Sequence, residues 1–216
     1  MKIRNGFVSN SSSSSFLVVY HTKDDFAKFS QFEGYDDLIN GIGGDSDEDV
    51  LSHISTVISS YLSCTTDRCS DYVTGTDMAS EFSSGEYFNL VYGLEIPDEM
   101  TSPIDKYDKA MWDYADEVKA AAVIPDKKAD HQGFWKYVDG IRKQISDKSE
   151  EVLSGTDGLK DMPNRILGFI KSKGYAVSCV EYGDDTDDGA YMEHEFMPFV
   201  AMAPRSGFYI HTLNLH

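Results

Sequence analysis

The feature that most constrains the fold is the order of its hydrophobic patterns, because strand-type runs stand near both ends and helix-type periodicity stands between them. Residues 16–20, FLVVY, form a β-branched and aromatic run typical of a buried strand. Further strands are predicted at 175–182, 190–202 and 208–215. This order predicts an α+β fold, with a mainly antiparallel sheet built from N- and C-terminal strands and a central group of helices packed on it.

The strongest helical signal lies at residues 46–62, SDEDVLSHISTVISSYL. Apolar side chains recur there every three or four positions, and Ser46 with Asp49 has the spacing of a capping box. Comparable patterns predict the remaining helices. Helices are therefore predicted at 23–32, 46–62, about 105–122, about 129–147 and 163–174.

The length of 216 residues and the 41% hydrophobic content are those of a globular chain with one sizeable core. We therefore expect a single domain spanning residues 1–216. A Ser-, Thr- and Asp-rich stretch at about 63–84 predicts an acidic, loop-rich insertion within it. Residues 86–96 alternate enough to predict a strand after that insertion.

The charge is strongly acidic and unevenly spread. The formal net charge is −18, and residues 29–105 hold sixteen acidic side chains against one basic side chain, Arg68. Direct nucleic-acid binding is not expected, because phosphate recognition needs a basic surface. High negative charge often serves solubility alone, but an acidic face can also dock on a basic protein surface. The predicted contact residues are Asp36, Asp37, Asp45, Asp47, Glu48 and Asp49.

Cysteine content and hydropathy indicate a cytoplasmic protein. The three cysteines, Cys64, Cys69 and Cys179, are too few for a disulfide framework and suit a reducing compartment. Their spacing supplies no zinc site. No secretory leader is expected, because the start of the chain lacks an apolar core segment, and no run is long enough to span a membrane. We expect neither a membrane partner nor a cofactor.

A run of five serines, Ser11 to Ser15, stands immediately before the first predicted strand. Its ordinary interpretation is a loop whose hydroxyls satisfy the local backbone. The alternative is a nest of N–H groups and hydroxyls that holds a phosphate or carboxylate, with Ser11, Ser12 and Ser13 as the anion-binding candidates. The run lacks the glycines and the Gly-Lys-Ser/Thr ending of a P-loop.

The first sixteen residues, MKIRNGFVSNSSSSSF, resemble an N-terminal segment of uncharacterised proteins from tailed bacteriophages and some bacteria. The shared pattern is a basic start, Gly-Phe-Val-Ser-Asn, a serine run and then Phe. The resemblance implies a phage or phage-like origin and a place in the host cytoplasm, with no activity attached. Together with the acidity, it favours a host-directed interaction or inhibitor protein that binds a basic host protein, including by mimicry of nucleic-acid charge. A minor structural protein of the virion is an alternative.

Residues 184–195, DDTDDGAYMEHE, place oxygen side chains and a glycine at positions used by calcium-binding loops. The candidate ligands are Asp184, Asp188 and Glu195. The flanking segments are predicted as strands, whereas that motif needs helices on both sides. An acidic hairpin turn is therefore the favoured interpretation.

An enzymatic alternative comes from Glu193-His194-Glu195, which resembles the Glu-x-Glu strand signature of arginine-directed ADP-ribosyltransferases. The resemblance implies catalytic roles for Arg4, Glu193 and Glu195, together with the serine run. Arg4 lies too close to the serines for a separate earlier strand, however, and the serines lack the Ser-Thr-Ser pattern. Alternating glutamates also occur on solvated strand faces. Whether the protein is an enzyme is left open, and an interaction protein is favoured.

Overall fold

The computed structural model describes residues 13–31, 35–76, 96–182 and 209–215. The chain divides into two compact units. Among the described residues, those up to His53 and from Leu167 onward form the first, which we call the sheet unit. Ile54 to Thr76 and Ile96 to Ile166 form the second, which we call the helical unit. The sequence predicts one domain, whereas each of these units has its own buried residues.

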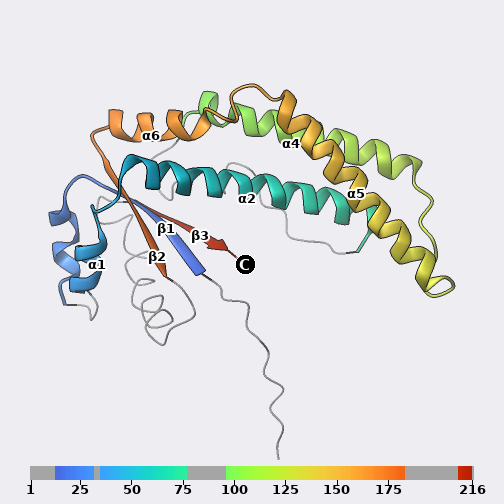
Figure 1. Ribbon diagram of the computed structural model, residues 1–216, viewed down its shortest axis with the longest axis horizontal. Helices are drawn as coiled ribbons and strands as arrows, with labels where there is room; N and C mark the ends of the chain where they lie inside the picture. Colours follow the sequence, from blue (N-terminus) through green and yellow to red (C-terminus); the bar gives the residue numbers. More distant parts are fainter. Residues whose placement is uncertain (1–12, 32–34, 77–95, 183–208, 216) are drawn as a thin grey trace, which may run out of the picture. The chain divides into compact units, whose positions relative to one another are not determined.

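The sheet unit is built on three antiparallel strands in the order β2-β1-β3 (Figure 1). These are β1 (Ser13–Tyr20), β2 (Ala176–Tyr182) and β3 (Tyr209–Leu215). In the central strand, Val18 lies opposite Ser178 on one side and Ile210 on the other. Four successive β1 residues, 17–20, are buried, so both faces of the strand are covered, which explains its unbroken apolar run. The predicted α+β class and the antiparallel sheet from the two ends of the chain are confirmed.

A short 3-10 helix, η1 (Lys23–Phe29), follows β1. The Asp25 carboxylate accepts hydrogen bonds from the backbone N–H groups of His21 (2.8 Å) and Thr22 (3.0 Å), which fixes the start of the helix. Phe26 is fully buried, and its ring packs edge-on against Tyr20 with 5.5 Å between centroids. The helix predicted at 23–32 is therefore present as a tighter helix that ends at Phe29.

Ser178 of β2 joins the sheet to the turn that follows α1 (Tyr35–Gly41). Its hydroxyl oxygen accepts a hydrogen bond from the Gly43 N–H (2.7 Å) and lies 3.3 Å from the Tyr20 hydroxyl. Gly43 has φ +89°, and a Cβ there would lie 3.2 Å from the Tyr20 hydroxyl oxygen. Both the positive φ and the close contact disfavour any residue other than glycine at position 43. The turn is held against β2 by the bond from Gly43 to Ser178.

Four α-helices make up most of the remaining described chain (Figure 1). They are α2 (Asp47–Thr74), α4 (Asp98–Ala121), α5 (His131–Gly155) and α6 (Met162–Ser172). The helical unit holds α2 from Ile54, all of α4 and α5, and the first turn of α6. The α4 and α5 core residues recur every three or four positions, as expected for helices that pack along their length. These buried residues are Ile104, Tyr107, Met111, Ala115, Val118, Phe134, Val138, Ile141 and Ile145.

Helix α2 continues through residues 63–74, which the sequence predicts as part of a loop-rich insertion. Buried Cys69 and Val73 extend its apolar stripe. The hydroxyls of Thr66, Ser70 and Thr74 each donate to the carbonyl four residues earlier, at 2.9 to 3.1 Å. These bonds satisfy polar side chains inside a helix, so a Ser- and Thr-rich composition did not prevent helix formation. Residues 77–84, and 86–95 of the predicted strand, lie outside the described residues.

Helix α4 begins at Asp98, earlier than predicted, and contains Pro103. Proline has no N–H, so the carbonyl of Glu99 loses its helical donor. Arg165 supplies a replacement, because its Nη2 donates to the Glu99 oxygen at 2.7 Å. Helix α6 spans Met162–Ser172, close to the predicted 163–174, and Gly174 follows it with φ +83°.

Candidate functional site

The acidic segment, which we define as residues 35–53, carries six carboxylates and no lysine or arginine. It comprises α1, the turn at Ile42–Ser46 and the first two turns of α2. All six predicted contact residues lie in this segment. They are Asp36, Asp37, Asp45, Asp47, Glu48 and Asp49.

Three of these carboxylates make contacts within the sheet unit. Asp45 accepts a hydrogen bond from the Cys179 N–H at 3.0 Å, which links the segment to β2. Asp47 forms an ion pair with Lys171 of α6, with 2.6 Å between Oδ2 and Nζ. Asp49 accepts hydrogen bonds from the N–H and hydroxyl of Ser46, and the hydroxyl bond is the main cause that lowers the pKa of Asp49. Asp45 therefore ties the segment to β2 and Asp49 caps the start of α2, while the Asp47–Lys171 pair is largely exposed and adds little stability.

Asp36 and Glu48 are exposed, and neither takes part in those contacts. Asp37 belongs to α1, but its side chain lies outside the described part of the structure. Carboxylates in the first turn of a helix also interact favourably with the helix dipole, so the acids at the start of α2 have a stabilising role of their own. The two acids best placed to meet a partner are Asp36 and Glu48.

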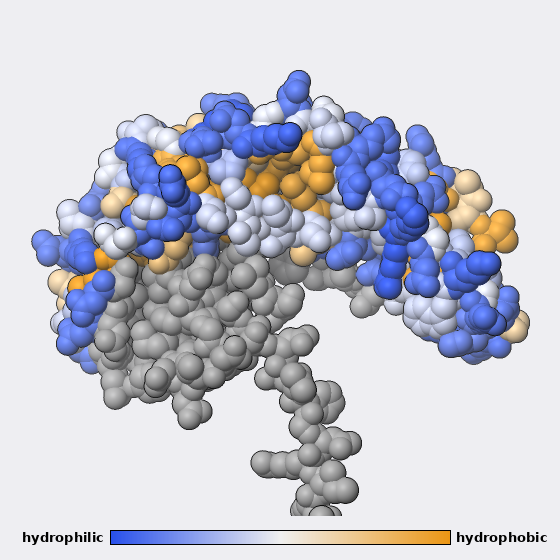
Figure 2. Space-filling model, viewed as in Figure 1, coloured by the Kyte–Doolittle hydropathy of each residue, from blue (hydrophilic) through white to orange (hydrophobic). Residues whose placement is uncertain are grey.

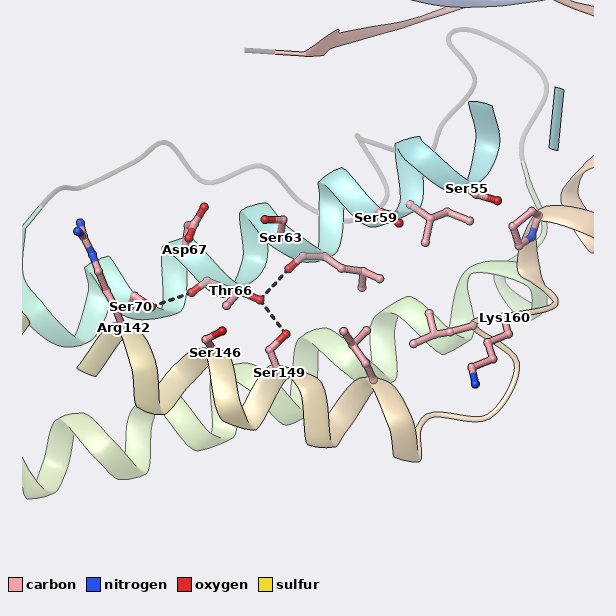
Figure 3. A pocket seen from close by; sticks show the side chains of 15 residues that line it. Ser55, Ser59, Ser63, Thr66, Asp67, Ser70, Arg142, Ser146, Ser149 and Lys160 are labelled. Atoms are coloured by element: carbon pink, nitrogen blue, oxygen red, sulfur yellow. Dashed lines mark hydrogen bonds between the residues drawn. The ribbon is translucent and has the colours of Figure 1, made fainter. Parts of the chain in front are cut away.

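A second candidate site is a groove of about 700 Å³ in the helical unit, between α2 and α5 (Figure 3). Its walls come from residues 55–70 of α2 and 142–153 of α5. Leu159, Lys160 and Pro163 close it where α5 leads into α6. All of its lining residues belong to the helical unit. The groove is thus an elongated surface along two helices.

Seven hydroxyl side chains line this groove: Ser55, Ser59, Ser63, Thr66, Ser70, Ser146 and Ser149. Thr66, Ser70 and Ser149 make hydrogen bonds within the helical unit. Within the described residues, the hydroxyls of Ser59, Ser63 and Ser146 form no hydrogen bond. Arg142 and Lys160 lie toward opposite ends of the row of labelled side chains (Figure 3).

Three hydroxyls form a hydrogen-bonded layer between α2, α4 and α5, and two of them, those of Thr66 and Ser149, also line the groove. The Tyr107 hydroxyl lies 2.8 Å from that of Thr66 and 2.7 Å from that of Ser149, and it also donates to the Leu62 carbonyl at 3.2 Å. Burial is the main cause that raises the pKa of Tyr107. The phenol therefore stays neutral, and the layer holds α2, α4 and α5 in one register.

Asp108 forms the other buried polar contact between α2 and α4. Its carboxylate accepts hydrogen bonds from the Tyr61 hydroxyl and from the Thr65 hydroxyl, the latter at 3.1 Å. Burial nevertheless raises the pKa of Asp108, with Asp105 adding to the effect. Burial likewise raises the pKa of the nearby Cys69 thiol to about 12, with further contributions from Asp108 and Asp116. Cys69 is thus a protonated core residue and a poor nucleophile at neutral pH.

The raised pKa of Asp108 gives a testable pH dependence. A carboxyl whose pKa is higher in the folded than in the unfolded state adds stability when protonated, below its unfolded pKa near 4. That contribution is lost as the pH rises through the folded pKa. Acidification from pH 7 to about 4 should therefore raise the melting temperature of the wild type relative to Asp108→Asn, which cannot titrate. A melting-temperature difference that does not change with pH, or moves the other way, would contradict this.

Among the described residues, the large exposed hydrophobic side chains belong to α2, to α4, to the link from α4 to α5, and to the start of α5: Tyr72, Trp112, Val123, Ile124 and Trp135. Figure 2 shows apolar surface, in orange, between hydrophilic residues of the helices. Val123 is the most exposed, at 88%. Lysine side chains cover part of the aromatic surface. Lys119 Nζ lies 3.4 Å from the Tyr72 ring centroid, and Lys127 Nζ lies 5.0 Å from that of Trp135. Cation–π contacts of this kind stabilise exposed aromatic rings without a partner.

Several predicted site residues lie outside the described residues: Arg4, Ser11, Ser12, Asp184, Asp188, Glu193 and Glu195. Ser13 to Ser15 belong to β1, where Ser14 pairs with both Tyr182 and Asn214. The backbone N–H groups of a strand alternate in direction within the sheet ladder, whereas a nest needs successive N–H groups that converge. The predicted loop is therefore a strand from Ser13 onward, and anion binding by the serine run stays a prediction.

In the described ranges, no group of three or more His, Cys, Asp or Glu side chains is arranged to hold a metal ion. Across the same ranges, every helix is too short or too polar to cross a membrane. No protein-family model matches the chain, and no curated protein or solved structure matches it either. Function must therefore be inferred from the geometry and charge of the chain itself.

Sequence reasoning identified the acidic segment but missed the groove. The signal for the groove was present, because Ser55, Ser59, Ser63, Thr66 and Ser70 recur every three or four residues. Because a loop was predicted from about residue 63, only the first part of that stripe was placed on a helix. The predicted helix for the α5 side of the groove was also too short, because it ended near residue 147, whereas α5 continues to Gly155.

Proposed function

We propose that this chain is an interaction protein that binds a basic protein surface through the acidic segment. The observation that carries the proposal is the fixed presentation of its charge. Asp45 and Asp47 link the segment to β2 and α6, while Asp36 and Glu48 are exposed. Complementary charge speeds and orients association most when the charged groups are held in place before binding.

The charge of the segment is only partly offset within the sheet unit. Lys171 pairs with Asp47, and Lys23 donates to the Ile39 carbonyl at 2.9 Å. Six carboxylates against these two lysines leave a negative excess. A lysine- or arginine-rich surface is the complementary partner, and surfaces of this kind are typical of proteins that handle nucleic acids. The resemblance of residues 1–16 to phage proteins supports a host protein as that partner, with mimicry of nucleic-acid charge as the mode of binding.

The test is affinity capture from bacterial lysate at low salt, with the tagged wild type beside Asp36→Lys/Glu48→Lys. This variant leaves Asp45, Asp47 and Asp49 in place, so the backbone of the segment should be retained. We expect the wild type to retain a basic protein that the variant captures at least about tenfold less, because steering by charge changes association rates by 10 to 10³.

The matched control is Glu117→Lys/Asp139→Lys, which makes the same change in net charge at two exposed positions of the helical unit. The control should capture the partner as the wild type does. Equal loss in both variants would show a dependence on net charge alone. Equal capture by all three proteins would exclude a role for this segment.

A further inference from the structure

The first turn of α5 contains a hydrogen bond between two side chains, those of His131 and Trp135. The indole Nε1–H of Trp135 donates to Nε2 of His131 at 3.0 Å, and the two rings meet edge-on with 6.2 Å between centroids. An indole N–H can only donate, so Nε2 must be unprotonated for this bond to exist. The bond therefore requires the neutral imidazole, with its one proton on Nδ1.

Protonation of His131 is incompatible with this bond. An imidazolium carries an N–H group on both ring nitrogens, so the Nε2–H group would face the indole N–H, donor against donor. Histidine side chains change charge between pH 5 and 8. We propose that the contact between His131 and Trp135 is a pH-sensitive switch, which holds the indole at neutral pH and releases it when His131 takes up a proton.

The surroundings of His131 oppose a positive charge beside the Trp135 ring. His131 is the first residue of α5, where the helix dipole disfavours a cation. Lys127 already lies over the Trp135 ring, with 5.0 Å between its Nζ and the ring centroid. An imidazolium beside the same ring would add a second positive charge, so both features favour release. The other charged side chains of the link from α4 and of this turn are Asp126, Lys128, Asp130 and Lys136.

The two carboxylates nearest in the chain are bonded to backbone groups. Asp130 accepts a hydrogen bond from an N–H group in the first turn of α5, and Asp126 accepts one from an N–H group of the link, both at 2.8 Å. Within the described residues, no carboxylate forms a hydrogen bond or an ion pair with His131. An imidazolium in this position would therefore lack an ion-pair partner. The charged groups at the neighbouring ends of α4 and α2 have other contacts, Lys119 with the Tyr72 ring and Asp71 with Arg142.

Release of the indole enlarges an exposed apolar surface. Trp135 is already 38% exposed, and Val123 and Ile124 of the preceding link are more exposed still. The switch thus makes the apolar surface at the start of α5 larger in acid than at neutral pH. It does not involve the acidic segment, so it can be tested whether or not that segment binds a basic protein.

The experiment is NMR spectroscopy of the full chain with isotope-labelled tryptophan, which gives one indole N–H signal for each of the two tryptophans. Trp112→Phe assigns the signals. As the pH is lowered from about 8 to 5, we expect the Trp135 signal to move upfield, because its hydrogen bond is lost, while the Trp112 signal stays in place.

Fluorescence separates release of the indole from simple quenching. In the Trp112→Phe variant, the emission maximum of Trp135 should move to longer wavelength over the same pH range, because the released indole is more exposed to water. A loss of intensity with no change in the emission maximum would show that the imidazolium only quenches an indole that stays in place. That result would overturn the proposal.

The matched control is His131→Gln, whose amide oxygen can accept the indole N–H and does not titrate. Its Trp135 signal should keep the neutral-pH position throughout. His131→Phe has no acceptor and should show the acid position at every pH. A Trp135 signal that does not move in the wild type, or that moves equally in His131→Gln, would also overturn the proposal.

Discussion

Replacing Tyr107 with alanine should be among the most damaging single changes in the helical unit, with a loss of about 3–5 kcal/mol in its free energy of unfolding. The side chain is fully buried, so its removal leaves a large cavity between α2, α4 and α5. It also removes the hydroxyl that bonds to Thr66, Ser149 and the Leu62 carbonyl. Denaturant-dependent hydrogen exchange of amides in α4 and α5 would measure the loss within this unit.

The matched variant is Tyr107→Phe, which keeps the ring and removes only the hydroxyl. The hydroxyls of Thr66 and Ser149 can still bond to each other, because their oxygens are 3.0 Å apart. The phenylalanine variant should therefore lose only about 1 kcal/mol. Equal losses in the two variants would mean that ring burial is not the main contribution. A loss below about 1 kcal/mol in the alanine variant would contradict the described packing.

In the sheet unit the corresponding change is Phe26→Ala, which should also cost about 3–5 kcal/mol. Phe26 is fully buried and packs edge-on against Tyr20, the last residue of the central strand. Its loss should raise hydrogen exchange in β1 and β2. Because the chain divides into two compact units, exchange should be read out for each unit separately.

The conservative variant Phe26→Leu shows how much of this loss comes from the buried volume and how much from the aromatic ring. Phe26→Leu keeps most of the buried volume and should cost less than about 1.5 kcal/mol. Thr22 and Asp25, which form the start of η1, are unchanged in both variants. If leucine were as damaging as alanine, the aromatic contact with Tyr20 would be the dominant contribution. If neither variant changed the exchange of β1, Phe26 would not be part of this core.

The sheet was predictable because its central strand carries its own signal. Leu17 to Tyr20 are all buried, and an unbroken apolar run of that length is typical of a strand covered on both faces. The periodic segments that became α4, α5 and α6 were also found. The C-terminal half of α2 was missed because serine and threonine are read as loop residues. In the structure, Thr66, Ser70 and Thr74 bond to their own helix, which only the backbone geometry could reveal.

The acidic segment was predictable in composition but not in the roles of its members. Counting charges cannot distinguish Asp45 and Asp47, which bond to Cys179 and Lys171, from Glu48, which is exposed. Their partners are more than one hundred residues away in sequence, so no local pattern records them. The groove depends in the same way on α2 and α5 lying side by side. Local periodicity predicts each wall and cannot predict that the two walls face each other.

The most direct test of the proposed function is the salt dependence of the association rate between the wild type and the basic protein that it captures. If the acidic segment steers binding, the rate constant should fall steeply as ionic strength rises from about 0.01 M to 0.15 M, where the Debye length shortens from about 30 Å to 8 Å. Asp36→Lys/Glu48→Lys should show a slower rate and a flatter dependence, while Glu117→Lys/Asp139→Lys keeps the steep one. A rate that is the same for all three proteins, or independent of salt, would contradict binding through this segment.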